Sequence, residues 1–134
     1  PGAVAYTAPV SGGSALKDQP LQRRMGFAGA GLRFAAARER SFRTQLALGT
    51  LLLVVLAVLR PPAVWWALCL LAAGLVLTAE MLNTALEQAL DRLHPERHEG
   101  IRIAKDCAAG AVLLASLTAV AIGALTVLVS LGWL

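Results

Sequence analysis

The chain has 134 residues, of which 57% are hydrophobic and only 15% are charged, and its formal net charge at pH 7 is +4. A soluble domain of this size usually carries about a quarter charged residues, so the composition argues against one and favours an integral membrane protein. The positive charge does not indicate nucleic-acid binding, because no basic stretch is interleaved with aromatic residues.

The N-terminal part of the chain predicts a tail followed by a surface helix. Residues 1–25 are rich in Gly, Ser, Pro and Ala and lack the apolar core of a signal peptide. We expect a disordered tail over 1–25, and Pro1 is compatible both with a native start and with a fragment end. Residues 26–40 mix apolar and basic side chains, which predicts an amphipathic helix on the cytoplasmic face of a membrane.

The rest of the domain, residues 26–134, contains three charge-poor segments. Residues 46–59, 63–79 and 107–134 carry no Asp, Glu, Lys or Arg. A helical membrane span needs roughly 20 mostly apolar residues, which each segment reaches when flanking residues are included. The predicted fold is therefore all-α, with three transmembrane helices over about 42–59, 63–93 and 101–133. Pro61 and Pro62 separate the first two helices, because proline lacks the amide donor.

A soluble helical bundle fits the third segment poorly, since no polar stripe follows Asp106. The two cysteines, Cys69 and Cys107, lie at different predicted depths, so we expect both to be unpaired packing residues.

The basic residues predict the orientation in the membrane. Seven precede the first span, four lie around the second connection, and only Arg60 lies in the first connection. The N-terminus and the second connection are therefore expected to be cytoplasmic, with the C-terminus on the far side.

The acidic residues gather around the end of the second span. Six of the eight lie within residues 79–112: Glu80, Glu87, Asp91, Glu96, Glu99 and Asp106. Glu80 directly follows a charge-free run, and an ionisable side chain in a spanning helix is costly, which suggests a function. Glu80, Asn83, Glu87 and Asp91 are spaced 3, 4 and 4 apart, so they share one helix face. This face, here called the acidic stripe, leads from the level of a lipid hydroxyl to water, where a nucleotide could bind.

Lys105 lies near the start of the third span, which should pack antiparallel to the second across a short connection. A lysine facing carboxylates suits phosphate bridged by a divalent cation. Simpler readings stay open: Asn83 as an interhelical hydrogen-bonding residue, Glu87 and Asp91 as a solvated helix end, or Glu80 in a proton path. Nucleotide-binding loops of the usual kinds are absent, and Pro95 between His94 and His98 disfavours a metal pair.

These residues also form a recognisable pattern. It comprises E-x-L-N-T-A-L-E at Glu80–Glu87, Asp91–Arg92, His98–Glu99, and A-K-D at Ala104–Asp106 followed by A-A-G-A-V. The pattern resembles the signature of the bacterial diacylglycerol kinase and undecaprenol kinase family, as do Gly31–Arg33 and the E-R-S-F-R run at Glu39–Arg43. The resemblance covers roughly residues 26–130.

The resemblance implies a homotrimer in the bacterial inner membrane, with active sites shared between subunits. It implies that Glu80 is the general base on the lipid hydroxyl and that Glu39 and Glu87 hold the Mg²⁺ that accompanies ATP. The resemblance further implies that Asn83 and Lys105 take part in catalysis. It also implies that ATP is contacted by Glu96, His98, Lys105 and Asp106, and the lipid by Arg33, Phe42 and Arg43.

The predicted function is transfer of the ATP γ-phosphoryl group to a membrane lipid alcohol, either diacylglycerol or undecaprenol. The N-T-A and K-D-x-A-A-G-A-V forms look slightly closer to the undecaprenol branch. Gln45, Arg97, Ala28 and Ala30 depart from the family pattern, which affects the assignment of lipid and adenine contacts. From other functional classes, the alternatives are a small ion- or proton-coupled transporter and a non-catalytic subunit of a membrane assembly.

Overall fold

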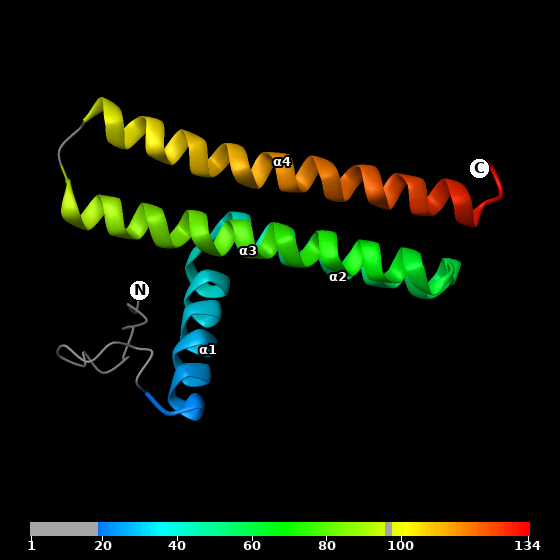
Figure 1. Ribbon diagram of the computed structural model, residues 1–134, viewed down its shortest axis with the longest axis horizontal. Helices are drawn as coiled ribbons and strands as arrows, with labels where there is room; N and C mark the ends of the chain where they lie inside the picture. Colours follow the sequence, from blue (N-terminus) through cyan, green and yellow to red (C-terminus); the bar gives the residue numbers. More distant parts are fainter. Residues whose placement is uncertain (1–18, 96–97) are drawn as a thin grey trace. The chain divides into compact units, whose positions relative to one another are not determined.

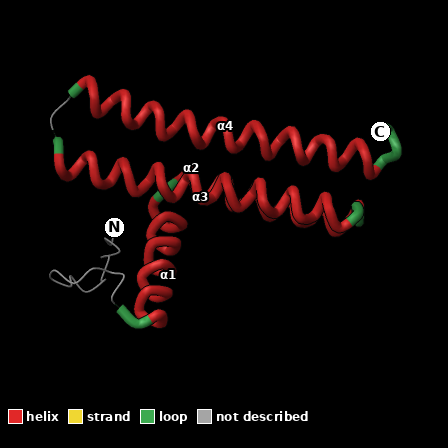
Figure 2. Tube along the Cα trace, in the orientation of Figure 1, coloured by secondary structure: helices red, strands yellow, loops and turns green. Residues whose placement is uncertain are grey.

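The computed structural model describes residues 19–95 and 98–134, and this part of the chain is helical. The helices are α1 (Leu21–Arg38), α2 (Arg40–Leu59), α3 (Ala63–Leu93) and α4 (Glu99–Ser130), shown in Figure 1 and, with their short connections, in Figure 2. The chain divides into two compact units, Pro1–Arg40 and Ser41–Leu134, and each is described by itself.

Helix α1 begins at Leu21, so the end of the predicted disordered tail, residues 21–25, is helical instead. The carbonyl of Pro20 accepts hydrogen bonds from the amides of Arg23 and Arg24 at 3.0 and 3.2 Å, which starts the first turn. Leucine, arginine and methionine are good helix formers, and this local preference extends the helix upstream of Gly26. Residues 1–18 lie outside the described residues, and a position of α1 on the membrane surface stays a prediction.

Helices α2, α3 and α4 have the length and composition of membrane spans. Among the described residues, these three helices contain 20, 31 and 32 residues, and the most apolar 18-residue stretch of each has a mean hydropathy of 2.0, 1.8 and 2.5, respectively. Large apolar side chains face outward along them, for example Leu71, Leu114 and Val120, which are 61%, 69% and 69% exposed. A surface of this kind is unfavourable in water and matches a hydrocarbon solvent. The three predicted spans are therefore confirmed as helices, with α4 shifted to 99–130 from the predicted 101–133.

Two short connections reverse the chain within Ser41–Leu134. Arg60 adopts a left-handed conformation with φ of 49°, and its amide bonds to the carbonyl of Leu56 at 2.8 Å, which ends α2 before Pro61 and Pro62. Helix α3 then ends at Leu93 and α4 begins at Glu99. Helices α3 and α4 consequently run antiparallel and side by side, and theirs is the most extensive helix contact of this unit (Figure 1).

Few residues of the three spans are fully buried, and those that are join the helices. Leu56 of α2, Cys69 of α3 and Thr126 of α4 are each no more than 1% exposed. The Thr126 hydroxyl donates to the carbonyl of Ile122 at 2.8 Å, so the thiol of Cys69, 3.3 Å away, donates to the threonine oxygen. Cys69 is thus a buried packing residue, Cys107 is exposed, and neither forms a disulfide, as predicted.

Candidate active site

Glu80 is buried in a helix that faces hydrocarbon. Its side chain projects from α3 and is only 2% exposed. The hydroxyl of Ser41, near the start of α2, donates a hydrogen bond of 2.5 Å to Glu80 Oε1. A buried carboxylate needs such a partner, because removing a charged or polar group from water is costly. Ser41 thereby fixes the orientation of the carboxylate.

A hollow of about 350 Å³ opens beside Glu80. Helix α2 contributes Ser41 and Gln45, α3 contributes Glu80 and Asn83, and α4 contributes Ala109, Val112, Leu113 and Ser116. Ligand pockets commonly have volumes of about 300–1,000 Å³, so this hollow is large enough to receive the polar end of a lipid. We call it the Glu80 hollow.

Asn83 and Glu87 continue along the same face of α3. The Asn83 Nδ2 amide donates to Glu87 Oε1 at 3.1 Å, which confirms that these two members of the acidic stripe are neighbours. The other polar atom of the Asn83 side chain, Oδ1, is buried and has no hydrogen-bond partner in the described part of the chain. Leaving a buried acceptor unpaired costs about 1–3 kcal/mol, so this atom is suited to bind a ligand or a cation.

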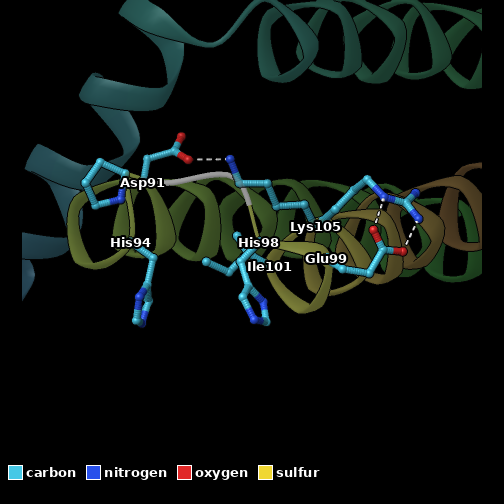
Figure 3. A pocket seen from close by; sticks show the side chains of 8 residues that line it. Asp91, His94, His98, Glu99, Ile101 and Lys105 are labelled. Atoms are coloured by element: carbon cyan, nitrogen blue, oxygen red, sulfur yellow. Dashed lines mark hydrogen bonds and ion pairs between the residues drawn. The ribbon is translucent and has the colours of Figure 1, made fainter.

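A second hollow, of about 540 Å³, lies where α3 and α4 approach their connection (Figure 3). Its lining residues are Asp91, His94, Pro95, His98, Glu99, Ile101, Arg102 and Lys105. Lys105 Nζ forms an ion pair with Asp91 Oδ1, so α4 meets the acidic stripe at its last member, as antiparallel packing predicts. The imidazoles of His94 and His98 project to the same side of this hollow (Figure 3).

Comparison with known proteins decides the family. The sequence model of prokaryotic diacylglycerol kinases matches residues 26–127. This chain belongs to the prokaryotic diacylglycerol kinase family. The resemblance carried by the E-x-L-N-T-A-L-E and A-K-D motifs is therefore confirmed.

Relatives of two kinds match the chain. A diacylglycerol kinase of Synechocystis sp. is 42% identical over 98 residues, which are 72% of this chain and 56% of that protein. A diacylglycerol kinase of Escherichia coli K12 is 40% identical over 96 residues, covering 71% of this chain and 78% of the relative. An undecaprenol kinase of Bacillus subtilis is 32% identical over 98 residues, covering 73% and 80%. The chain thus spans little more than half the length of the Synechocystis relative.

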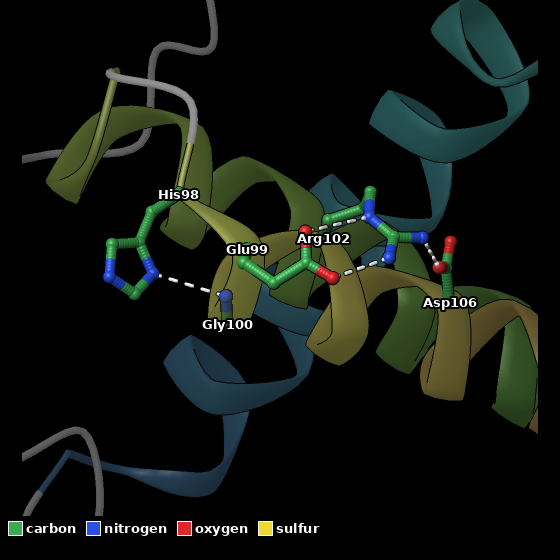
Figure 4. Close-up of polar contacts among 5 residues, drawn as sticks. All are labelled: His98, Glu99, Gly100, Arg102 and Asp106. Carbon is green, nitrogen blue, oxygen red and sulfur yellow. Dashed lines mark hydrogen bonds and ion pairs between the residues drawn. The ribbon is translucent and has the colours of Figure 1, made fainter.

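His98 and Asp106 belong to the sequence motifs that resemble the family, and they lie at the start of α4 (Figure 4). His98 Nδ1 accepts the amide of Gly100 at 3.1 Å and so caps the helix. Arg102 pairs with Glu99 at 2.6 Å and with Asp106 at 2.9 Å. These side chains are exposed, and such pairs contribute little stability, so Arg102 holds Asp106 only weakly.

The remaining predicted site residues lie at the start of α2, in the unit that contains α1, or outside the described residues. Phe42 is buried at the start of α2, and Arg43 beside it is exposed. Glu39 and Arg33 belong to the unit that contains α1, so their roles toward the lipid and Mg²⁺ stay predictions. Glu96 lies outside the described residues.

Within residues 19–95 and 98–134, no group of three or more His, Cys, Asp and Glu side chains could hold a metal ion. The donor set of α3 nevertheless suits Mg²⁺, which proteins usually bind through one or two carboxylates together with substrate phosphates. Glu87 supplies one carboxylate, and Asn83, whose Nδ2 is bonded to it, has an unpaired Oδ1 on the same side chain.

The sequence reasoning did not single out Ser41 or Ser116, which line the Glu80 hollow. It named Gln45 only as a departure from the family pattern and His94 only in a disfavoured metal pair, and these two residues also line the hollows. Ser41 could have been found, because it is the central residue of the E-R-S-F-R run. Gln45 directly precedes the charge-free run 46–59, and Ser116 lies within the run 107–134. A polar side chain in such a place was the available sequence signal for both residues.

Proposed function

We propose that this protein transfers the γ-phosphoryl group of ATP to the hydroxyl of a membrane lipid alcohol. The observation that carries the proposal is Glu80, a buried carboxylate of a membrane-spanning helix that already accepts a hydrogen bond from a hydroxyl group. Membership of a family whose named relatives are diacylglycerol and undecaprenol kinases supports the same chemistry. No family relationship favours the transporter or the assembly subunit.

Glu80 acts as the general base in this proposal. The lipid hydroxyl enters the Glu80 hollow and donates its proton to the carboxylate, whose oxygens can each accept more than one hydrogen bond. The hydroxyl oxygen forms a new bond to the γ-phosphorus, and the bond from that phosphorus to the bridging oxygen breaks. ADP leaves with the electron pair. Because phosphoryl transfer depends mainly on positioning and electrostatics, a small helical site can support it.

The nucleotide phosphates are proposed to bind along the acidic stripe toward the second hollow. Lys105 exchanges its ion pair with Asp91 for the phosphates and offsets their charge. His98 and Glu96 near the connection, and Asp106 once released from Arg102, are the proposed nucleotide contacts. Glu87 and Asn83, together with Glu39, would hold Mg²⁺, which lowers the negative charge of the phosphates when bound.

The assembly and orientation are part of the proposal. We expect a homotrimer in a bacterial inner membrane, with the N-terminus and the α3–α4 connection in the cytoplasm, as the basic residues predict. Small residues of α4 that are exposed in the chain, such as Ala111 and Ala121, permit close helix packing between subunits.

The proposal is tested by incubating the purified protein in mixed micelles with labelled ATP, Mg²⁺ and either diacylglycerol or undecaprenol. We expect labelled phosphate to appear in the lipid fraction only when a lipid acceptor is present. Glu80→Gln keeps the shape of the side chain and removes the base, so turnover should fall at least about a hundredfold. Nucleotide binding, measured by titration with a fluorescent ATP analogue, should be unchanged. Turnover near that of the unmodified protein would contradict the role of Glu80.

A further inference from the structure

An apolar groove adjoins the Glu80 hollow. This groove has a volume of about 370 Å³, and most of its lining is aliphatic, with Leu52 and Val55 of α2, Val76 of α3 and Val127 of α4 among its residues. Gln45 and Ser116 line both the Glu80 hollow and the groove. The two spaces therefore meet at this pair of polar side chains.

Gln45 and Ser116 contact each other across α2 and α4. The Gln45 Nε2 amide donates to Ser116 Oγ at 3.2 Å, and both side chains are partly buried. A primary amide has two N–H donors and a carbonyl acceptor, and a hydroxyl has its own donor, so the pair retains hydrogen-bonding capacity after this contact. Unused capacity is unfavourable next to hydrocarbon, and a ligand that uses it gains binding energy there.

The position of the pair is defined relative to Glu80. Gln45 lies four residues after Ser41 on α2, so both share one helix face, about 6 Å apart along the axis. Ser41 is bonded to Glu80. The pair thus lies about one helical turn from the proposed base, at the side of the hollow that leads to the apolar groove.

We propose that Gln45 and Ser116 bind an ester group of the lipid substrate, and that the preferred acceptor is consequently an acylglycerol and not a polyprenol. A diacylglycerol carries an ester on the carbon next to its free hydroxymethyl group. With that hydroxyl at Glu80, the neighbouring ester carbonyl reaches the donors of Gln45 and Ser116, and an acyl chain continues into the apolar groove. A polyprenol has no polar group beyond its hydroxyl and leaves both donors unpaired. This inference rests on the proposed kinase function.

The test measures kcat/KM for the phosphorylation of three acceptors by the protein in mixed micelles. They are a diacylglycerol, the matching dialkylglycerol with ether-linked chains, and a long-chain polyprenol. The diether keeps the hydroxyl and both hydrocarbon chains but lacks the carbonyl oxygens. We expect kcat/KM for the diester to exceed that for the diether by about tenfold, the scale of one lost hydrogen bond. The polyprenol should be slower than the diester as well.

Variants of the pair separate recognition from folding. Gln45→Leu has nearly the same volume and removes both hydrogen-bonding groups, so kcat/KM for the diester should fall about tenfold while that for the diether changes by less than about twofold. Ser116→Ala should also reduce the preference for the diester over the diether. Ser116→Thr keeps the hydroxyl and should largely retain that preference. Thr118→Ala is the matched control, because that exposed hydroxyl bonds only to its own helix at the carbonyl of Leu114.

Three results would overturn the inference. The first is equal use of diester and diether by the unmodified protein, and the second is a preference for the polyprenol. The third is an equal loss for all acceptors in both Gln45→Leu and Ser116→Ala, because a purely structural contact predicts that pattern. If no acceptor is phosphorylated at all, the proposed kinase function itself fails, and this outcome is distinct from the other three.

Discussion

At the residue scale, the contact between Ser41 and Glu80 links two helices through one hydrogen bond. The spacing of Glu80, Asn83 and Glu87 on one helix could be predicted, because contacts three and four residues apart follow from helix geometry alone. The Ser41 contact could not, since it depends on how α2 packs against α3. The contact between Gln45 and Ser116 could not be predicted for the same reason, since it depends on how α2 packs against α4.

Ser41→Ala should reduce kcat for lipid phosphorylation by about tenfold, because Glu80 loses the donor that orients it and a hydrogen bond to a charged group is worth about 1.5–3 kcal/mol. Ser41 is exposed, so the substitution should leave folding intact. Steady-state kinetics at saturating ATP and Mg²⁺ give kcat directly. Ser41→Thr retains the hydroxyl and should stay within about threefold of the unmodified protein. An unchanged kcat in Ser41→Ala would show that the hydrogen bond does not support the base.

At the scale of elements, most of the helix bounds could be predicted from the distribution of charged residues along the sequence. The predicted 63–93 helix agrees with α3 (Ala63–Leu93), because Pro61 and Pro62 fix its start. The start of α1 was placed too late, since the Gly- and Ala-rich composition around residue 26 concealed the helix-forming residues Leu21 to Met25. Propensity over a single turn is a weak signal, and the fold determines which turns are formed.

The ion pair between Asp91 of α3 and Lys105 of α4 leads to a prediction about the KM for ATP. The side chains of Lys105 and Asp91 are 32% and 62% exposed, so the pair is worth no more than about 1 kcal/mol. If Lys105 must leave Asp91 to bind phosphate, Asp91→Asn should lower KM for ATP by up to about fivefold. Lys105→Met should raise KM for ATP instead.

Titration of ATP at fixed lipid and at saturating Mg²⁺ measures both effects. Glu99→Gln is a suitable control for Asp91→Asn, because it also removes one negative charge from the lining of the second hollow but leaves the Lys105 pair intact. A large rise of KM in Asp91→Asn would contradict competition and would indicate that Asp91 itself binds the nucleotide or its cation.

At the scale of the whole molecule, the Ser41–Leu134 unit buries little of its helix surface within the chain. The charge-poor segments predicted three spans but carried no information on which outward faces meet lipid and which meet another subunit. Only 22% of the most apolar stretch of α3 and 6% of that of α4 is buried within the chain. A site that must exclude water and enclose two substrates therefore needs further surface, which a second copy of the chain can provide.

The shared site is tested by mixing two inactive chains, Glu80→Gln and Glu39→Gln. In a cyclic homotrimer whose sites combine Glu80 of one subunit with Glu39 of the next, random mixing in equal amounts leaves about a quarter of the sites with both residues. Activity should recover to about that fraction of the unmodified protein. As a control, Glu80→Gln mixed with Glu87→Gln should recover nothing, because both residues lie on the same face of α3 and serve one site. Recovery in neither mixture, with mixed oligomers demonstrated by two affinity tags, would show that each subunit carries a complete site.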